Sequence, residues 1–185
     1  MLQIRWHSRA GQGAVTGAKA LAEVLAAEGK FVQAFSVYGA EKRGAPMNAF
    51  NRVSDEEIID HSKEMFPDYV LVIDPSLVFS GNITRNTKDT TKYIITTDLS
   101  KEELLKQAPF LEGKEFYVLD CIKISMETIG KPIPNTPMLG ALMKVSGIFS
   151  LEAFLEGMKK ILKKFPQKVI DGNNAAITRA YNEVN

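Results

Sequence analysis

The sequence is poor in the residues that bind metals and form disulfides. It has 185 residues but one cysteine, Cys121, and two histidines, His7 and His61. A single thiol excludes an internal disulfide, an all-cysteine zinc site and an iron–sulfur cluster held within this chain. The two histidines have no cysteine or acidic partner at ligand spacing, so a metal site is not expected. No histidine lies near Cys121 in sequence to activate it, and a buried structural thiol is expected there.

The chain also lacks long apolar runs and a strong charge of either sign. No apolar stretch approaches the length of a membrane span, and the first residues follow a strand pattern rather than that of a signal peptide. The formal net charge is +1, so there is no extended electrostatic field. This argues against a general nucleic-acid binder. We expect a cytoplasmic protein that binds neither nucleic acid nor membranes.

What the sequence does contain is an alternation of strand and helix patterns. Hydrophobic residues make up 45% and charged residues 24% of the chain, which are ordinary globular values. The length fits one domain over residues 1–185 with its own core. We predict strands at residues 2–6, 31–37, 69–73, 93–97 and 116–119, a more exposed edge strand at 47–53, and helices at 14–28 and 101–107. This order predicts an α/β fold, namely a Rossmann-like open sheet, mostly parallel, with helices on both faces.

Local signals mark where several of these elements begin and end. Gly29 follows the last turn of the first predicted helix, where a left-handed cap is expected. Ser100 is the expected cap of the helix at 101–107. Residues 54–57 have the pattern of a capping box and predict a short turn of helix. The apolar run at 69–73 predicts a strand that is buried on both faces.

From Cys121 onward the pattern is helical, which predicts a helical C-terminal extension. Breaks are expected at residues 131–134, at Gly147 and at Pro166. Residues 171–174 resemble part of a thiamine-diphosphate motif but lack its leading glycine, and we predict a helix N-cap there instead. Residues 138–149 are rich in large apolar side chains, more than one small sheet needs to cover. We predict that part of this surface forms an interface with another chain.

A glycine-rich turn, residues 10–17, joins the first predicted strand to the first predicted helix. Glycine permits the sharp bend and lets a ligand approach the backbone, while the helix N-terminus adds unpaired N–H groups. Thr16 stands where the dinucleotide fingerprint has its third glycine, and residues 37–39 lack the acidic residue that holds a ribose. The pattern therefore disfavours a nicotinamide cofactor. It leaves a phosphate contact and simple close packing of the helix both open.

A second loop, residues 38–46, carries the adjacent cations Lys42 and Arg43. In a parallel sheet this loop lies beside the glycine turn, at the carboxyl ends of the strands. Lysine supplies a point charge and arginine a planar, two-pronged donor for phosphate or carboxylate. The alternative is a solvated surface turn in which Glu41 neutralises one charge. We favour the first interpretation and predict that the two loops together receive an anionic group.

Three segments, in this order along the chain, resemble the gamma subunit of 2-oxoacid:ferredoxin oxidoreductases. They are GQGAVTGAKALA at residues 11–22, YGAEKRGAP at 38–46 and NTPMLGA at 135–141. The resemblance runs from about residue 3 to the C-terminus and is strongest to the pyruvate enzyme of that family. One departure is Ala10, where the family often has a further glycine.

The resemblance implies a chain that packs on the alpha, beta and delta subunits of one enzyme and helps to bind coenzyme A. That enzyme decarboxylates a 2-oxoacid oxidatively on thiamine diphosphate, passes electrons through iron–sulfur clusters to ferredoxin, and transfers the acyl group to coenzyme A. Thiamine diphosphate, magnesium and the clusters are expected in the partner subunits. No catalytic residue is expected in this chain. Carried over to this sequence, the resemblance assigns coenzyme A binding to Gly11, Gln12, Gly13, Lys42, Arg43 and Asn135.

Three alternatives remain open at this point. The chain could be the gamma subunit of a related enzyme acting on 2-oxoisovalerate, 2-oxoglutarate or indolepyruvate, since the substrate pocket is expected mostly in other chains. It could be a structural scaffold subunit, in which the glycine turn packs on a partner and touches no ligand. A free-standing nucleotide-binding domain with its own redox activity is disfavoured by the missing ribose-binding acid and the absence of a cysteine cluster.

Overall fold

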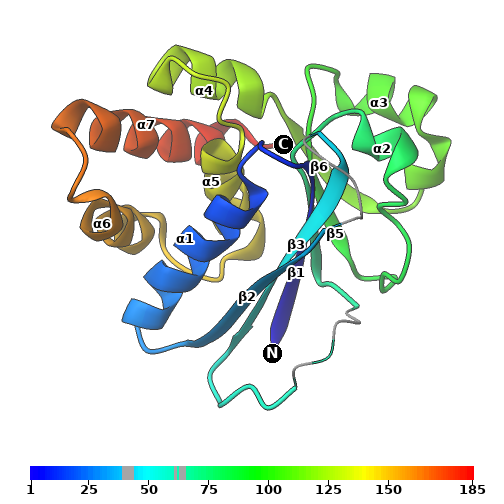
Figure 1. Ribbon diagram of the computed structural model, residues 1–185. Coiled ribbons are helices and arrows are strands. Elements are labelled where there is room, and N and C mark those ends of the chain that lie inside the picture. The colour runs from blue at the N-terminus through cyan, green and yellow to red at the C-terminus, as the bar shows by residue number, and fades with distance from the viewer. Residues whose placement is uncertain (39–43, 61, 63–65) are drawn as a thin grey trace.

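The computed structural model describes residues 1–38, 44–60, 62 and 66–185. In this part of the chain, six strands form one twisted sheet (Figure 1). Their order across the sheet is β2-β3-β1-β4-β5-β6. The bounds are β1 (Leu2–Arg9), β2 (Phe31–Tyr38), β3 (Pro46–Ser54), β4 (Tyr69–Val72), β5 (Lys92–Thr96) and β6 (Glu115–Leu119). Strands β1, β4, β5 and β6 run parallel to one another, whereas β3 runs antiparallel to both of its neighbours.

Helices cover both faces of the sheet, as predicted. The bounds are α1 (Ala14–Ala27), α2 (Leu77–Ser80), α3 (Lys101–Gln107), a 3₁₀ turn (Pro109–Leu111), α4 (Cys121–Ile129), α5 (Asn135–Ser146), α6 (Leu151–Leu162) and α7 (Gln167–Glu183). Figure 1 shows α1 and α4 to α7 on one side of the sheet and α2 and α3 on the other. Each side has its own apolar core: Trp6, Leu71 and Ile94 face the first group, and Val70 and Ile95 face the second. Among the described residues, none of the helices combines the length and the apolar composition needed to cross a bilayer.

Several local predictions are confirmed. The first helix starts after Gly13, which has φ +90°, and is followed by Gly29 with φ +85°. These are left-handed conformations that glycine adopts without a Cβ clash. Ser100 and Glu103 form a complete capping box at the start of α3. The breaks near residues 131–134 and at Gly147 and Pro166 separate α4, α5, α6 and α7.

The position of β3 differs from the prediction. The strand expected at an exposed edge lies between β1 and β2, and β2 is the edge strand. Two polar residues caused the error: Asn51 and Arg52 are 0% and 1% exposed, so their polarity does not report solvent contact. Conversely, the apolar Phe31 and Val37 of β2 are 46% and 41% exposed. Hydrophobic pattern alone does not distinguish an edge strand from an inner one when buried polar groups find partners.

The helical turn expected at residues 54–57 is absent. The backbone N–H of Glu56 donates to Ser54 Oγ at 3.2 Å, but residues 55–60 contain no helix. The guanidinium of Arg52 donates instead to the carbonyl oxygens of Asp60 (2.6 Å) and Ser62 (2.7 Å), which holds this segment to the sheet in an extended form. A tertiary contact therefore overrides the local capping signal.

Most of the large apolar side chains of α5 are buried within this chain. Helix α5 lies between α1, α7 and the sheet, and Met138, Leu139, Leu142 and Met143 are each no more than 1% exposed. Its contact with α7 is so close that a Cβ added at Gly140 would overlap the backbone of α7. The helices after β6 therefore form part of the main core, and these four side chains are not available to a partner. Val145, Ile148 and Phe149 are only partly buried, and an interface with another chain at these residues stays a prediction.

Residues 171–174 do not cap a helix as predicted. They lie inside α7, which already begins at Gln167 after Pro166. The side chain of Asn173 donates to the carbonyl oxygen of Val169 at 2.7 Å and accepts from Thr136 Oγ1 at 3.1 Å. These contacts satisfy a polar side chain in mid-helix and join α7 to the start of α5.

Candidate functional site

The glycine turn lies at the carboxyl end of β1, where the fold changes direction. After β1 the chain passes to α1 on one face, and after β4 it passes to α2 on the other face, so the adjacent ends of β1 and β4 form a topological switch point. Open α/β sheets bind ligands at such a crevice. The loop at which the sequence prediction placed the site lies at this switch point, and that a ligand binds there stays a prediction.

The N-terminus of α1 points its backbone donors out of the glycine turn. Gly13 occupies the N-cap position, no side chain caps the helix, and its first turn contains no acidic residue. Within the described residues, the N–H groups of Ala14, Val15 and Thr16 have no acceptor. Gly11 and Thr16 are exposed. Unpaired N–H groups and the helix dipole together favour an anion at this position.

Asn135 is brought against this turn from the start of α5. A Cβ built on Gly13 would lie 2.9 Å from Asn135 Cγ, so no side chain other than hydrogen fits between the loop and Asn135. Asn135 is 5% exposed, and its Oδ1 has no hydrogen-bond partner among the described residues. The fold thus unites Gly11, Gln12, Gly13 and Asn135 in one place, although Asn135 is separated from the loop by more than a hundred residues.

Gln12 spans the crevice between the ends of β1 and β4. Its Nε2 donates to Asp74 Oδ2 at 2.5 Å, and its Oε1 accepts from the backbone N–H of Arg9 at 2.8 Å and from Ser8 Oγ at 3.2 Å. Both ends of the amide are therefore used. This side chain fixes the loop that precedes α1 to the loop that follows β4.

Asp74, Ser76 and Arg9 complete this network and were not predicted as site residues. Asp74 Oδ1 accepts from the backbone N–H (2.9 Å) and the hydroxyl (2.5 Å) of Ser76. The Arg9 guanidinium donates to Ser76 Oγ at 2.9 Å and lies 3.5 Å from Asp74 Oδ2. Burial would raise the pKa of Asp74, but the hydrogen bonds from Ser76 and Gln12 and the charge of Arg9 outweigh it and lower the pKa. The available sequence signal was Asp74-Pro75 at the end of a buried strand.

The second predicted loop is attached to the first at its C-terminal end. Ala10 N–H donates to the carbonyl oxygen of Ala45 at 3.0 Å, and Arg9 Nη1 donates to that of Gly44 at 3.1 Å. The described end of this loop therefore lies beside the glycine turn, even though β3 separates β1 from β2. Lys42 and Arg43 lie outside the described residues, and their predicted role stays a prediction.

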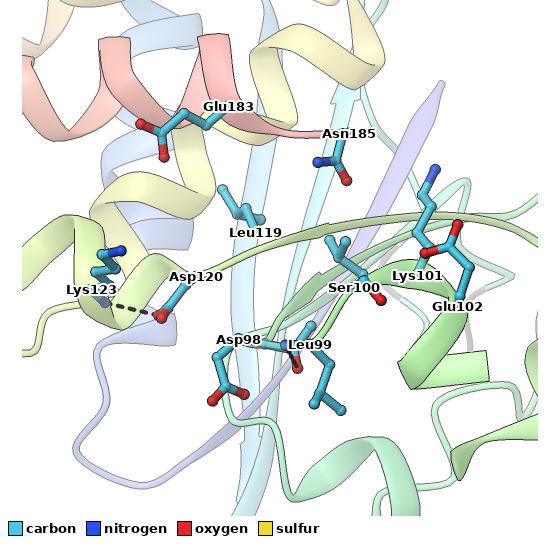
Figure 2. A pocket seen from close by; sticks show the side chains of 12 residues that line it. Asp98, Leu99, Ser100, Lys101, Glu102, Leu119, Asp120, Lys123, Glu183 and Asn185 are labelled. Atoms are coloured by element: carbon cyan, nitrogen blue, oxygen red, sulfur yellow. Dashed lines mark hydrogen bonds between the residues drawn. The ribbon is translucent and has the colours of Figure 1, made fainter. Parts of the chain in front are cut away.

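A cavity lies further along the same edge of the sheet. It has a volume of about 640 Å³ and opens between the carboxyl ends of β5 and β6 (Figure 2). Its charged lining residues are Asp98, Lys101, Glu102, Asp120, Lys123 and Glu183. Acidic side chains outnumber basic ones, and the Asp120 carboxylate already accepts from the backbone N–H of Lys123 at 2.8 Å. This lining disfavours a phosphate group, so we do not place the anion site here.

Of the three groups that sequence analysis discounted, Cys121 and His7 are buried, and His61 lies outside the described residues. Cys121 is 0% exposed, and burial raises the pKa of its thiol to about 12, which confirms the prediction of an inert structural cysteine. His7 is 3% exposed. Burial, together with the nearby charge of Arg5, lowers the pKa of His7 to about 3. The ring is therefore neutral at physiological pH.

Comparison with known proteins gives a consistent picture along the whole chain. The family model described as "Pyruvate ferredoxin/flavodoxin oxidoreductase" matches residues 3–183. Pyruvate synthase subunit PorC of Thermotoga maritima is 46% identical over 98% of this chain and 94% of its own length. The pyruvate/ketoisovalerate oxidoreductases common subunit gamma of Thermococcus kodakarensis is 40% identical over 99% and 97%.

Solved structures agree with these sequence matches. The crystal structure of pyruvate oxidoreductase subunit PORC from Thermotoga maritima superposes with a TM-score of 0.86, at 42% identity over 100% of this chain and 97% of that one. A 2-oxoglutarate:ferredoxin oxidoreductase from Magnetococcus marinus, with 2-oxoglutarate, coenzyme A and succinyl-CoA bound, has a TM-score of 0.78 at 21% identity. It is covered over 30% of its length, against 98% of this chain, and at that identity it supports the fold alone.

Proposed function

Because the chain belongs to the pyruvate ferredoxin/flavodoxin oxidoreductase family, we propose that it is the gamma subunit of a multi-subunit pyruvate:ferredoxin oxidoreductase. The assembled enzyme decarboxylates pyruvate oxidatively to acetyl-CoA and reduces ferredoxin. Full-length similarity to pyruvate synthase subunits supports this assignment. Alpha, beta and delta subunits are its partners in the cytoplasm.

Within that enzyme, the partner subunits carry thiamine diphosphate, magnesium and the iron–sulfur clusters. This chain has one cysteine, and that thiol is fully buried, so its own residues do not fit a cluster. The described residues also contain no group of three or more histidine, cysteine and acidic side chains arranged to hold a metal. The contribution of this chain lies in binding and positioning rather than in the redox chemistry.

The role we assign to this chain is to hold phosphate groups of coenzyme A at the glycine turn. The observation that carries this proposal is the uncapped N-terminus of α1 at the β1/β4 switch point, with unpaired N–H groups beside exposed Gly11. Lys42 and Arg43 immediately precede Gly44, which is bonded to this turn, and they supply the positive charge. A related oxidoreductase of the same fold has coenzyme A bound.

Two further residues hold the turn in shape for this task. Asn135 packs so closely on Gly13 that no side chain fits there, which restricts the turn to this shape. Gln12 ties the turn to Asp74 across the crevice. Since Asn135 is almost fully buried, we assign it a positioning role rather than direct contact with coenzyme A.

Steady-state kinetics of the assembled enzyme test the proposal. The variants are Lys42→Ala, Arg43→Ala and Arg43→Lys. The matched control is Lys163→Ala, an exposed lysine that directly follows α6. Charge-assisted contacts to phosphate are worth about 1.5–3 kcal/mol, so loss of either cation should raise the KM for coenzyme A about tenfold to a hundredfold. Arg43→Lys should recover only part of this loss, because an ammonium group does not reproduce the planar fork.

Decarboxylation itself should change less, because coenzyme A is required only after the carbon–carbon bond has broken. An unchanged dependence on coenzyme A in all three variants, with the complex intact, would contradict the proposal and favour a scaffold subunit. The relative shared by pyruvate and ketoisovalerate oxidoreductases supports a second candidate, a gamma subunit common to enzymes for more than one 2-oxoacid. Turnover of 2-oxoisovalerate by the same complex tests it.

A further inference from the structure

The two edge strands of the sheet differ in what covers them. Strand β2 forms one edge and β6 the other (Figure 1). The outer edge of β6 is partly closed by this chain itself, because the backbone N–H of Val118 donates to the carbonyl oxygen of Asn185 at 3.0 Å. The ammonium group of Lys101 also lies 5.7 Å and 5.0 Å from the ring centroids of Phe116 and Tyr117. Chain segments and charged side chains of this kind protect an edge strand from pairing with another strand.

Strand β2 has none of these protections in the part of the chain that the structure describes. Its sequence, FVQAFSVY, contains no charged residue, proline or glycine. It pairs with β3 in an unbroken register, from Phe31↔Ser54 to Tyr38↔Met47, with no bulge that would bend the strand. Every second residue of an antiparallel edge strand directs its N–H and C=O away from the neighbouring strand. The sheet ends at β2, so these backbone groups face outward.

The side chains of β2 leave apolar surface beside this open backbone edge. None of residues 31–37 is buried, and Ala34, at the centre of the strand, is exposed. Phe35 is held in place: its ring stacks on that of Phe50 with 5.1 Å between centroids, and the guanidinium of Arg52 lies 5.4 Å from its centroid. A strand whose side chains are already fixed loses less entropy when another strand binds to it.

The charge and length of this edge indicate what covers it. An uncharged strand offers no partner to a charged side chain, so the strand that pairs with it is uncharged too. An eight-residue strand is about 27 Å long and a sheet about 10 Å thick, so pairing along β2 buries about 500 Å² in total. Stable, specific interfaces bury about 1,200–2,000 Å². Two copies of this chain joined only along β2 fall short of that area, whereas a subunit with further contacts elsewhere on this chain does not.

We propose that β2 pairs, backbone to backbone, with an extended and uncharged segment of a partner subunit, which continues the sheet by one strand. This rests on the proposed function only in that the chain is one subunit of a larger enzyme. The added strand lies beyond β3 and β2 from the end of β1. Docking at this edge therefore holds the domain in the complex and leaves the switch point between β1 and β4 open.

Amide hydrogen exchange of the free full-length chain and of the assembled complex tests the pairing directly. The outward N–H groups of β2 exchange with solvent in the free chain and are hydrogen-bonded in the complex. About half of the amides of residues 31–38 should therefore exchange about tenfold more slowly in the complex. The amide of Val118, which is already bonded to Asn185, is the internal reference and should not change.

A substitution on the edge tests whether assembly depends on it. Ala34→Lys places a charge at the middle of the edge, a device by which natural edge strands prevent pairing. The matched control is Ala175→Lys, at an exposed position of α7. Each variant is co-expressed with the parent chain and the other subunits, and its share of the purified complex is measured by mass spectrometry. Ala34→Lys should be depleted about tenfold and Ala175→Lys not at all, while both free variants unfold at the urea midpoint of the parent.

The possible outcomes separate this proposal from the proposed function. If β2 exchanges equally fast in the free chain and the complex, and Ala34→Lys is incorporated like the parent, no strand is added at this edge. If β2 is already protected in a free chain that sediments as a dimer, the occupant is a second copy and the proposal is wrong. If the parent does not co-purify with the other subunits, the proposed function fails and the docking with it. Protection of β2 in a complex whose dependence on coenzyme A is unchanged by Lys42→Ala and Arg43→Ala would support the docking and contradict only the coenzyme A role.

Discussion

The two faces of β1 differ in whether their buried polar side chains have hydrogen-bond partners. On the face covered by α1, Trp6 Nε1 donates to Asn51 Oδ1 at 2.9 Å, and Asn51 Nδ2 donates to the carbonyl oxygen of Ala18 at 2.8 Å. Donor and acceptor needs are matched inside the protein. On the opposite face, His7 Nε2 and Arg5 Nε have no hydrogen-bond partner among the described residues, although both residues are less than 10% exposed.

The hydrogen bonds on the two faces therefore contribute differently to stability. A satisfied buried network rigidifies the core and costs little, whereas an unsatisfied one costs free energy until something binds. Successive residues of β1 face opposite sides of the sheet. Trp6 joins the sheet to α1 through Asn51, and His7 lines a pocket on the other side. Substitutions on the covered face are therefore predicted to lower the free energy of unfolding more than substitutions on the open face.

The largest expected effect is on the covered side, at the contact between α5 and α7. A methyl group added by Gly140→Ala would overlap the carbonyl oxygen of Ile177, which is backbone and has no room to move. The variant should lose at least about 3 kcal/mol of unfolding free energy in urea denaturation. Gly147→Ala, at the end of the same helix, meets open space and only the strain of φ +60°, so it should lose about 1–2 kcal/mol. Equal losses would show that α5 and α7 are not so tightly packed.

The second prediction compares two asparagines on β3 that face opposite sides of the sheet. Asn51→Ala should cost about 2–4 kcal/mol, because it leaves Trp6 Nε1 and the Ala18 carbonyl without partners and opens a small cavity. Asn48→Ala should stay within about 0.5 kcal/mol, because its side chain bonds to no described protein group. Urea denaturation of both variants measures the contrast. A similar loss in both would remove the distinction between the two faces.

The smallest effect concerns His7 and pH. Burial first, and then the charge of Arg5, lowers the pKa of His7 to about 3, against about 6.5 in the unfolded chain. Between these values the unfolded state binds a proton that the folded state does not, so stability falls as the pH falls. The loss should approach about 1.4 kcal/mol for each pH unit below 6.5. Thermal melts of the parent and of His7→Gln between pH 7 and 5 should diverge by that slope. Parallel curves would mean that His7 ionises in the folded protein.

Local signals in the sequence predicted much of the fold correctly. The glycines around α1, the capping box of α3 and the helix breaks after Cys121 all act over a few residues, through backbone sterics and N–H satisfaction. Two of the errors have the same physical cause. The capping pattern at residues 54–57 lost to the contacts of Arg52, and the buried Asn51 made an inner strand resemble an edge. In both cases a contact with residues outside the local segment outweighed the local preference.

The candidate site likewise has features that the local sequence determines and features that depend on tertiary contacts. The sequence by itself determined the glycine turn after β1 and the helix that begins there, because a sharp turn with φ +90° at Gly13 requires glycine. It also contains the cationic pair Lys42 and Arg43, whose role stays a prediction. Only the tertiary structure decided that Asn135 packs on Gly13, that Gln12 reaches Asp74, and that His7 lies in a pocket with Asn48. These contacts join residues far apart along the chain, and burial of the surrounding apolar side chains offsets the entropy lost in bringing them together.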